Sequence, residues 1–307
     1  MAAVEVENLS VRYGAHVAVR DVSLSIADGE LFGLLGTNGA GKTSTVECLV
    51  GLRSRAGGRV SVLGHDPARR SPALFDQLGV QLQTSALPDK LTVIEALTEF
   101  RSFYSNPLSL EQALTLLDLH PIRNQRWKTL SGGQKQRLAV ALAMIGRPRL
   151  AVLDELSTGL DPEARRDSWQ VIETIREQGV TVLLVTHFMD EAERLCDRVV
   201  VLDHGAVVAE GRPGELVDRL LTDSQRVDFW TESPIEQRDL ADLPGVDRVL
   251  VDDHQVTVHG HGDLIIELTS ALARIGIVAH DLRVGQRNLD DAFVALARQT
   301  THAEASS

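Results

Sequence analysis

Hydrophobic and polar residues follow two different patterns along the first two thirds of the chain. Apolar side chains stand two positions apart in VEVENLSVRYG and AVRDVSLSI, which predicts antiparallel strands with one buried face. Continuous apolar runs come later and are typical of parallel strands buried on both faces. These runs are LFGLLG (31–36), LAVLD (150–154), VTVLLVT (180–186) and RVVVLD (198–203), and RVSVLG (59–64) is a further short strand.

Helical patterns separate the apolar runs. From about residue 84 to 145 the pattern is helical; Thr92 and Glu95 form a capping box there, and Ser109 caps the next helix. Alternation of strands and helices predicts an α/β fold with a mainly parallel sheet and helices on both faces. We expect one domain over 1–220, in which an antiparallel β subdomain and a helical subdomain over about 84–145 accompany the parallel sheet.

The pattern changes near residue 221. A strand pair is predicted by VDRVLVDD and HQVTVHG, an amphipathic helix by DLIIELTSALARIG, a strand by IVAHDLRV and a last helix by NLDDAFVALARQ. We predict a small C-terminal α+β domain over 221–300, with a role in dimerisation or regulation, and a disordered tail over 301–307.

Charge and cysteine content exclude several classes of protein. The net charge is −12, and residues 221–307 hold 15 acidic and 7 basic side chains, so nothing favours nonspecific binding to nucleic acid or to an anionic membrane surface. The two cysteines, Cys48 and Cys196, lie far apart and indicate a reducing cytosol. The segment MAAVEVENLS lacks the pattern of a secretory signal, and no run approaches the roughly 18 apolar residues of a spanning helix. We therefore expect a globular chain that does not cross a membrane by itself.

The segment GTNGAGKTS (36–44) matches a phosphate-binding loop: Gly, four residues, then Gly-Lys-Thr, between an apolar run and a helix. Glycines let successive backbone N–H groups face phosphate oxygens, and the helix that begins near Lys42 adds its positive end. Lys42 is expected to contact the β- and γ-phosphates and Thr43 to ligate Mg²⁺. A plain glycine turn before a helix is the alternative. The predicted loop residues are Gly36, Thr37, Asn38, Gly39, Ala40, Gly41, Lys42, Thr43 and Ser44.

Three polar residues follow continuous apolar runs and are expected near this loop. Asp154 and Glu155 end the run LAVLDE, and His187 follows VTVLLVT. Ligands of open α/β sheets bind at the carboxyl ends of the strands. We therefore predict Asp154 as a magnesium ligand, Glu155 as the residue that orients or deprotonates water, and His187 as a hydrogen-bond donor to the γ-phosphate. A solvated turn and a structural histidine are the alternatives.

A second candidate anion site lies in LSGGQKQR (130–137). Ser131 is a natural N-cap, and Gln134 three residues later completes a capping box. Gly132 and Gly133 leave the first N–H groups of the helix open to an anion. A capped helix that binds nothing is the alternative, but two glycines weaken a helix start. Their presence indicates close approach to a ligand.

Together these motifs resemble the ATP-binding subunits of ABC transporters. The phosphate loop, LSGGQKQR, LAVLDE, STGLDP and the histidine occur in that family's order over residues 1–220. The resemblance implies a P-loop NTPase fold of the ABC type, ATP and Mg²⁺ as cofactors, and ATP hydrolysis coupled to transport. It also implies a head-to-tail dimer, here a homodimer, in which each LSGGQ segment caps the ATP held by the other subunit's phosphate loop.

The resemblance implies roles for three further residues. Tyr13 matches the aromatic that stacks on adenine, with an ordinary strand tyrosine as the alternative. Gln83 matches the glutamine that contacts the metal and senses the γ-phosphate, and Gln81 is a near neighbour. Gln83 also leads into the helical subdomain that faces the membrane partner. Asp161, in STGLDP, matches the aspartate that crosses the dimer interface.

Two residues depart from the family's pattern, and the C-terminus indicates a subtype. Thr37 and Leu156 each stand where proline is commoner, and Leu156 frees φ beside the predicted catalytic glutamate. NLDDAFVALARQ resembles the end of the daunorubicin-resistance type, the ATP-binding halves of bacterial drug exporters. This resemblance implies a permease on a separate chain, export of a drug or antibiotic-like compound, and a position at the cytoplasmic face of the cell membrane.

A soluble ABC-type ATPase that acts on ribosomes or DNA is the alternative. Translation-factor relatives carry two cassettes in one chain and DNA-repair relatives insert coiled coils or zinc modules, whereas this chain has one cassette without such insertions. Its negative charge also argues against a nucleic-acid partner. His259 and His261 could be imagined as metal ligands, but their period-two spacing without a nearby cysteine favours ordinary surface histidines.

Overall fold

The computed structural model describes residues 2–82, 86–221, 224–285 and 288–293. The chain divides into two compact units, Met1–Pro213 and Gly214–Ser307. The break follows Pro213, whereas the sequence pattern predicts it after residue 220. Gln83 and the predicted tail over 301–307 lie outside the described residues.

The first unit is organised around a six-stranded sheet. Its strands are β3 (Leu31–Leu35), β5 (Leu78–Gln81), β6 (Leu150–Asp154), β7 (Thr181–Thr186), β8 (Arg198–Asp203) and β9 (Ala206–Gly211). They lie in the order β5-β6-β7-β3-β8-β9, all parallel except β9, which pairs antiparallel with β8. Every residue of β3, β6 and β7 is buried, as their continuous apolar sequences predict.

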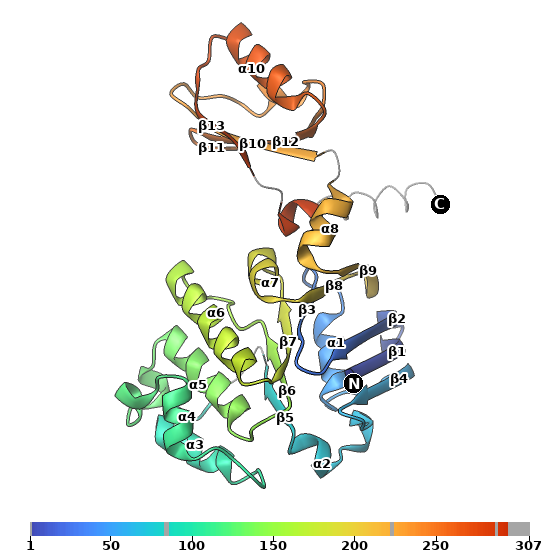
Figure 1. Cartoon of the computed structure of the whole chain (residues 1–307), viewed down its shortest axis with the longest axis vertical. Coiled ribbons are helices and arrows are strands. Elements are labelled where there is room, and N and C mark those ends of the chain that lie inside the picture. The colour runs from blue at the N-terminus through green and yellow to red at the C-terminus, as the bar shows by residue number, and fades with distance from the viewer. Residues whose placement is uncertain (1, 83–85, 222–223, 286–287, 294–307) are drawn as a thin grey trace. The chain divides into compact units, whose positions relative to one another are not determined.

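A three-stranded antiparallel sheet completes the core of this unit. It consists of β1 (Ala2–Tyr13), β2 (His16–Ala27) and β4 (Gly57–Val62), in the order β2-β1-β4. Figure 1 shows α1 (Lys42–Leu49) beside this sheet. Val6 of β1, Val46 of α1 and Val152 of β6 belong to one hydrophobic cluster, so the two sheets and α1 share a core. The alternating pattern at the N-terminus is thereby explained, since one face of each strand points into this core.

Besides α1, further helices connect the strands of the first unit from β5 onward. They are α3 (Val93–Arg101), α4 (Leu110–Leu116) and α5 (Gly132–Met144) between β5 and β6, α6 (Pro162–Glu177) between β6 and β7, and α7 (Met189–Leu195) between β7 and β8. Figure 1 shows α3, α4 and α5 grouped in one helical region, as the pattern predicts. The predicted caps are confirmed: Thr92 and Glu95 form a capping box, and so do Ser109 and Gln112.

The second unit is built on a four-stranded antiparallel sheet. Its strands are β10 (Ser224–Thr231), β11 (Val246–Asp252), β12 (Gln255–His261) and β13 (Ala279–Gly285), in the order β11-β12-β10-β13. Leu264 and Leu268 of α10 (Leu264–Arg274) share a hydrophobic cluster with Val227 and Phe229 of β10. The predicted strand pair, amphipathic helix and later strand are confirmed. Strand β10 is absent from the sequence prediction although it pairs with both β12 and β13.

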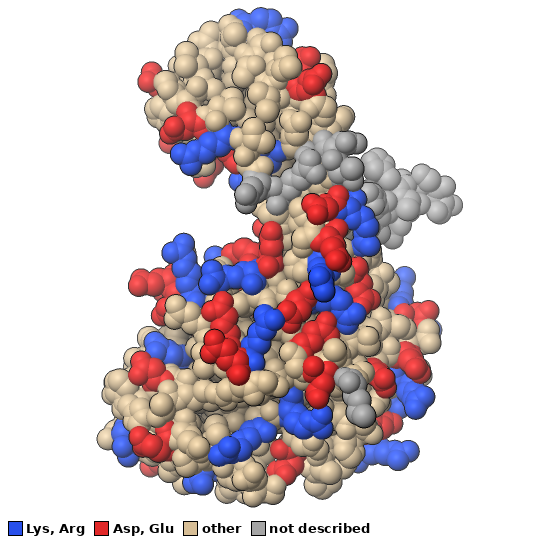
Figure 2. Space-filling view, viewed as in Figure 1, with Lys and Arg blue, Asp and Glu red and all other residues tan. Residues whose placement is uncertain are grey.

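The helices and the surface charges bear on membrane and nucleic-acid partners. Within the described ranges, no helix has the length and apolar character needed to span a bilayer. Figure 2 shows acidic and basic side chains intermixed on the viewed face, without a continuous basic area. This distribution gives no electrostatic footprint for nucleic acid on that face.

Candidate active site

The predicted phosphate loop lies between the carboxyl end of β3 and the start of α1. Gly36 has φ 151° and Gly41 has φ 100°, a region that side chains rarely adopt. A Cβ on Gly36 would lie 2.4 Å from the carbonyl oxygen of Leu202, and one on Gly41 would lie 2.6 Å from that of Ala18. Close backbone approach therefore requires glycine at both positions. Gly41 caps α1 without a side-chain hydrogen bond, which leaves the first amides of α1 open to phosphate oxygens.

Lys42 closes the loop from inside. Its side chain is buried, and Nζ donates hydrogen bonds to the carbonyl oxygens of Gly36 at 2.7 Å and Thr37 at 3.1 Å. Burial lowers the pKa of Lys42, whereas the nearby carboxylates of Glu155 and Asp154 raise it. A cation held in this way lies where phosphate charge would collect. The loop residues Thr37, Asn38, Gly39 and Thr43 are exposed, and Ala40 and Ser44 are buried beneath them.

Strand order brings the other predicted residues to the same edge of the sheet. Strand β7 lies between β6 and β3, and all three are parallel. Asp154 is paired with Val185, and Leu35, which precedes the loop, is paired with Thr186. His187 follows β7 directly, so it stands between Asp154 and the phosphate loop. The carboxyl edge thus combines cation, carboxylates and imidazole as the pattern predicts.

Asp154 is the most strongly perturbed carboxyl group at this edge. Only 2% of the residue is exposed, and burial raises its pKa to about 6, with the charge of Glu155 acting in the same direction and Lys42 opposing them. A buried anion with incomplete compensation favours a cation beside it. The carboxylate of Asp154 and the hydroxyl of Thr43 in the phosphate loop are hard oxygen ligands, the type that Mg²⁺ prefers.

Glu155 and His187 face one another. Glu155 has φ 50°, its N–H donates to the carbonyl oxygen of Val185 at 2.8 Å, and only 10% of its side chain is exposed. Oε1 lies 3.5 Å from Nδ1 of His187, and Oε2 accepts a hydrogen bond from Oγ1 of Thr158 at 3.3 Å. The imidazole is one third exposed and packs on the ring of Phe188. A carboxylate held beside an accessible imidazole can act on water at the sheet edge.

The second predicted anion site lies at the start of α5. Ser131 Oγ accepts a hydrogen bond from the Gln134 N–H, and the Gln134 side chain accepts one from the Ser131 N–H at 3.0 Å, so the predicted capping box is confirmed. A Cβ on Gly132 would meet only Leu160 at 3.7 Å, and one on Gly133 only Ala164 at 3.8 Å, both ordinary contacts. Packing inside this chain therefore does not require glycine at either position.

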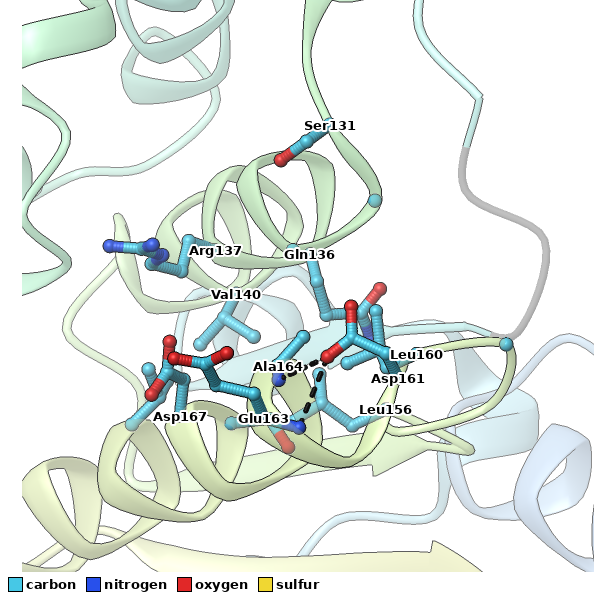
Figure 3. A pocket seen from close by; sticks show the side chains of 15 residues that line it. Ser131, Gln136, Arg137, Val140, Leu156, Leu160, Asp161, Glu163, Ala164 and Asp167 are labelled. Atoms are coloured by element: carbon cyan, nitrogen blue, oxygen red, sulfur yellow. Dashed lines mark hydrogen bonds between the residues drawn. The ribbon is translucent and has the colours of Figure 1, made fainter.

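A cavity of about 360 Å³ separates α5 from α6 beside this helix start, and Figure 3 shows its lining. Leu156, which stands where the family usually has proline, is fully buried and forms part of the cavity wall. Asp161 caps α6 by accepting hydrogen bonds from the N–H groups of Glu163 and Ala164 at 3.1 and 2.9 Å. None of the phosphate-loop residues lines this cavity.

Comparisons with known proteins decide the family. Residues 19–158 match the sequence profile of the family described as ABC transporter. The Nod factor export ATP-binding protein I of Rhizobium etli is 35% identical over 306 residues, which cover 96% of this chain and 93% of that protein. The chain belongs to the ABC transporter ATP-binding proteins. It is accordingly an ATP-binding protein and an ATPase of that family.

Solved structures agree with this ABC ATPase in fold. A structure described as the ATP-binding subunit of an ABC transporter is 30% identical and superposes with a TM-score of 0.63, covering 71% of this chain and 92% of the other. A dimeric bacterial ABC transporter cassette is 25% identical with a TM-score of 0.60, over 68% and 98% of the two chains. The predicted P-loop NTPase fold of the ABC type is confirmed. The relative named above concerns Nod factor export and not daunorubicin resistance, so that subtype stays a prediction.

Tyr13 of the ABC ATPase lies against the phosphate loop. Its hydroxyl is within 3.0 Å of Ser44 Oγ, the guanidinium of Arg53 lies 4.3 Å from its ring centroid, and 44% of the residue is exposed. Arg53 also pairs with Glu47. The role of Arg53 is absent from the sequence prediction, because no local pattern links it to Tyr13. A ring that is partly exposed beside the loop can take a base on its free surface.

The glutamine predicted to contact the metal cannot be placed, because Gln83 lies outside the described residues. Its neighbour Gln81 ends β5, where it is paired with Leu153, the residue before Asp154. Gln81 is buried, its Nε2 donates to the carbonyl oxygen of Leu82 at 2.8 Å, and its Oε1 has no hydrogen-bond partner in the described structure. The geometry therefore keeps Gln81 open as the alternative that the sequence left.

His259 and His261 of the second unit pair with different carboxylates. His259 Nδ1 lies 3.3 Å from Asp291, and His261 Nδ1 lies 3.5 Å from Asp247. Burial lowers the pKa of His259. Among the residues that the structure describes, no three His, Cys, Asp or Glu side chains gather as a metal site.

Magnesium binding is expected to weaken as the pH falls through the pKa of Asp154. A carboxyl group must be deprotonated to ligate a metal, and the raised pKa of about 6 places this titration near neutral pH. Above this pH the Asp154 carboxyl group is mostly ionised and can bind the metal. Below it, protons compete with the metal for the carboxylate. Mn²⁺ titrations of the ATP-loaded protein, followed by electron paramagnetic resonance a unit above and a unit below that pKa, measure the effect. Asp154→Asn serves as the control for titration of the nucleotide, and an equal pH dependence in both proteins contradicts the prediction.

Proposed function

We propose that two copies of this chain form the ATP-driven part of an exporter whose membrane permease is a separate chain. The observation that carries the proposal is the separation of two anion sites within one subunit. Figure 1 shows α5 well apart from α1, with strands of the six-stranded sheet between them. Each site is incomplete alone, and a head-to-tail dimer brings the start of α5 of one copy to the phosphate loop of the other.

The two glycines at the start of α5 support this dimer. Neither has a positive φ, and neither is required by packing against Leu160 or Ala164. Glycine there lowers helix stability by about 1 kcal/mol relative to alanine, so its use points to a ligand outside the subunit. The open amides of α5 and its positive end suit the γ-phosphate of a nucleotide bound by the other copy.

The residues at the sheet edge divide the work of hydrolysis. The loop amides and Lys42 would hold the phosphates, and Thr43 and Asp154 would hold Mg²⁺, which would neutralise phosphate charge. Glu155 orients water and accepts its proton, and His187 donates a hydrogen bond to the γ-phosphate. Gln83 and Tyr13 complete the contacts to metal and adenine, and Asp161 crosses the dimer interface. Closure occurs with ATP, and hydrolysis reopens the dimer.

An exposed aromatic groove supports a membrane partner at the helical region. Phe103 is 68% exposed after the end of α3, and Phe75 is 36% exposed at the end of α2 (Pro72–Phe75). The groove between them is about 600 Å³ and also contains Tyr104, whose ring packs against Gly146. Large exposed aromatics side by side mark interaction surfaces. We infer that an apolar helix of the permease occupies this groove.

Phe103→Asp is expected to lower the amount of permease that copurifies by at least about tenfold. A charge placed in an apolar contact removes a hot-spot interaction. ATP binding should be unchanged, since Phe103 lies outside the nucleotide site. Affinity-tagged protein is expressed in its own cell, and the membrane proteins retained after gentle solubilisation are quantified. Ile266→Asp, at a position 63% exposed in the second unit, is the matched control. Retention of the permease by the Phe103 variant rules out this groove.

The same copurification tests the proposed function as a whole. A multispanning permease recovered with the wild-type chain in stoichiometric amount supports the transporter. Recovery with ribosomes or DNA instead supports the soluble alternative, which the net charge of −12 disfavours. The relative from Rhizobium etli is named for export, which supports an exporter. The resemblance of the C-terminus to the daunorubicin-resistance type supports a drug or antibiotic-like compound as the substrate. Uptake and efflux assays in cells with and without the chain decide that substrate class.

A further inference from the structure

Glu191 is a fully buried acidic residue that none of the recognised motifs includes. It lies in the first turn of α7 with no exposed surface. Burial raises the pKa of its carboxyl group, and polar hydrogens of Ser157, Thr186 and Trp169 oppose this shift. Carboxyl groups are rarely fully buried unless they are paired, so its presence needs an explanation.

The carboxyl group of Glu191 contacts the segments that carry Glu155 and His187. Oε1 accepts a hydrogen bond from Oγ of Ser157, which is buried two residues after Glu155. Thr186, the residue before His187, faces the same carboxyl group and also accepts a hydrogen bond from the N–H of Phe188 at 3.0 Å. One side chain therefore joins the end of β7 to the turn after β6.

Two buried atoms beside this contact lack a hydrogen bond of regular geometry. Thr186 and Trp169 approach the carboxyl group, but Oε2 of Glu191 and Nε1 of Trp169 form no such hydrogen bond within the described part of the chain. Burying polar atoms without a full set of partners destabilises a fold, and an apolar residue of similar size would avoid that cost. A group retained at this expense is better explained by a role in the reaction than by stability.

We propose that Glu191 is a positioning residue for ATP hydrolysis, holding Glu155 and His187 in register through Ser157 and Thr186. The proposal rests on the roles assigned above to Glu155 and His187, whose reacting side chains lie 3.5 Å apart. Misplacement of such groups by about 1 Å can cost on the order of 10²-fold in rate. The nucleotide-binding residues Tyr13 and Lys42 lie outside this network, so ATP binding should not depend on it.

Four variants test the proposal: Glu191→Leu, Glu191→Gln, Ser157→Ala and, as the control, Glu193→Gln on the exposed face of α7. Steady-state ATPase kinetics, equilibrium binding of ATP and thermal unfolding are measured for each. We expect Glu191→Leu and Ser157→Ala to lower kcat by about 10- to 100-fold with unchanged ATP affinity. Glu191→Gln should keep the contact with Ser157 and restore most of kcat with the wild-type pH profile. A fifth protein that combines Glu191→Leu with Ser157→Ala should have a kcat no lower than that of the worse single variant, because both substitutions break the same contact.

The outcomes separate this proposal from the proposed function. Wild-type kcat in folded Glu191→Leu and Ser157→Ala overturns it, and so does a parallel loss of kcat, ATP affinity and melting temperature, which marks a structural role only. If Glu191→Leu does not fold, Ser157→Ala decides. A normal rate in Glu155→Gln would instead remove the assignment of Glu155, whichever result the Glu191 variants give.

Discussion

Glu155→Gln is expected to lower kcat for ATP hydrolysis by about 10²- to 10⁴-fold, the usual contribution of a general base, while ATP still binds. The amide has the size of the carboxylate but cannot accept the proton of the attacking water. The residue is held by its backbone contact to Val185 and by Thr158, so the substitution should leave the fold unchanged. ATP then accumulates uncleaved, and the closed dimer persists.

Two measurements check this expectation. Phosphate release gives the rate, and size-exclusion chromatography with ATP and Mg²⁺ gives the dimer fraction. Glu177→Gln, at an exposed position at the far end of α6, is the matched control and should behave as the wild type. Turnover by Glu155→Gln at the wild-type rate would falsify the assignment of the base. A slow variant that stays monomeric with ATP keeps the base but contradicts the closed dimer.

Lys42→Ala is expected to weaken ATP binding by on the order of 10²-fold or more, because truncating one partner of a buried charge contact costs about 2–5 kcal/mol. The lysine is buried within the loop, and its ammonium lies on the carbonyl oxygens of Gly36 and Thr37. Removing it leaves those carbonyls without this donor and the phosphates without their nearest cation. Isothermal titration with ATP and Mg²⁺ measures the loss.

The control for this variant is Lys128→Ala, which removes an exposed lysine of the same chain without touching the loop. Both proteins should melt at similar temperatures without nucleotide, and only the wild type and the Lys128 variant should gain stability on adding ATP. Equal ATP affinity in Lys42→Ala and the wild type shows that the phosphates bind elsewhere.

Local features of this structure follow from the sequence because their partners are close along the chain. The capping boxes of α3, α4 and α5 each join residues three apart, so the pattern alone identifies them. Asp154 and His187 could be assigned to one edge because buried parallel strands end on the same side of a sheet. Neither inference needs knowledge of distant packing.

Features that depend on distant partners could not be predicted in this way. Ser157 and Glu191 are 34 positions apart, and no spacing rule links them. Strand β10 carries charged residues among its apolar ones, and its pairing with β12 and β13 is what stabilises it. The break after Pro213 depends on which contacts α8 (Pro213–Leu220) makes, not on the composition of that segment.

The order of the strands determines how a movement at the nucleotide site would reach the helical region. The chain enters the helical region of α3, α4 and α5 from the carboxyl end of β5 and returns at the amino end of β6, its parallel neighbour. The helical region is therefore attached to the sheet at the carboxyl end of one strand and at the amino end of its neighbour. Of the two attachments, only the one at Gln81 lies at the carboxyl ends of the strands, where the phosphates are expected, so we expect a displacement there to turn the helices about the attachment at Leu150. Because β6 and β7 are buried along their whole length, we expect the sheet to stay fixed while the helical region turns against it.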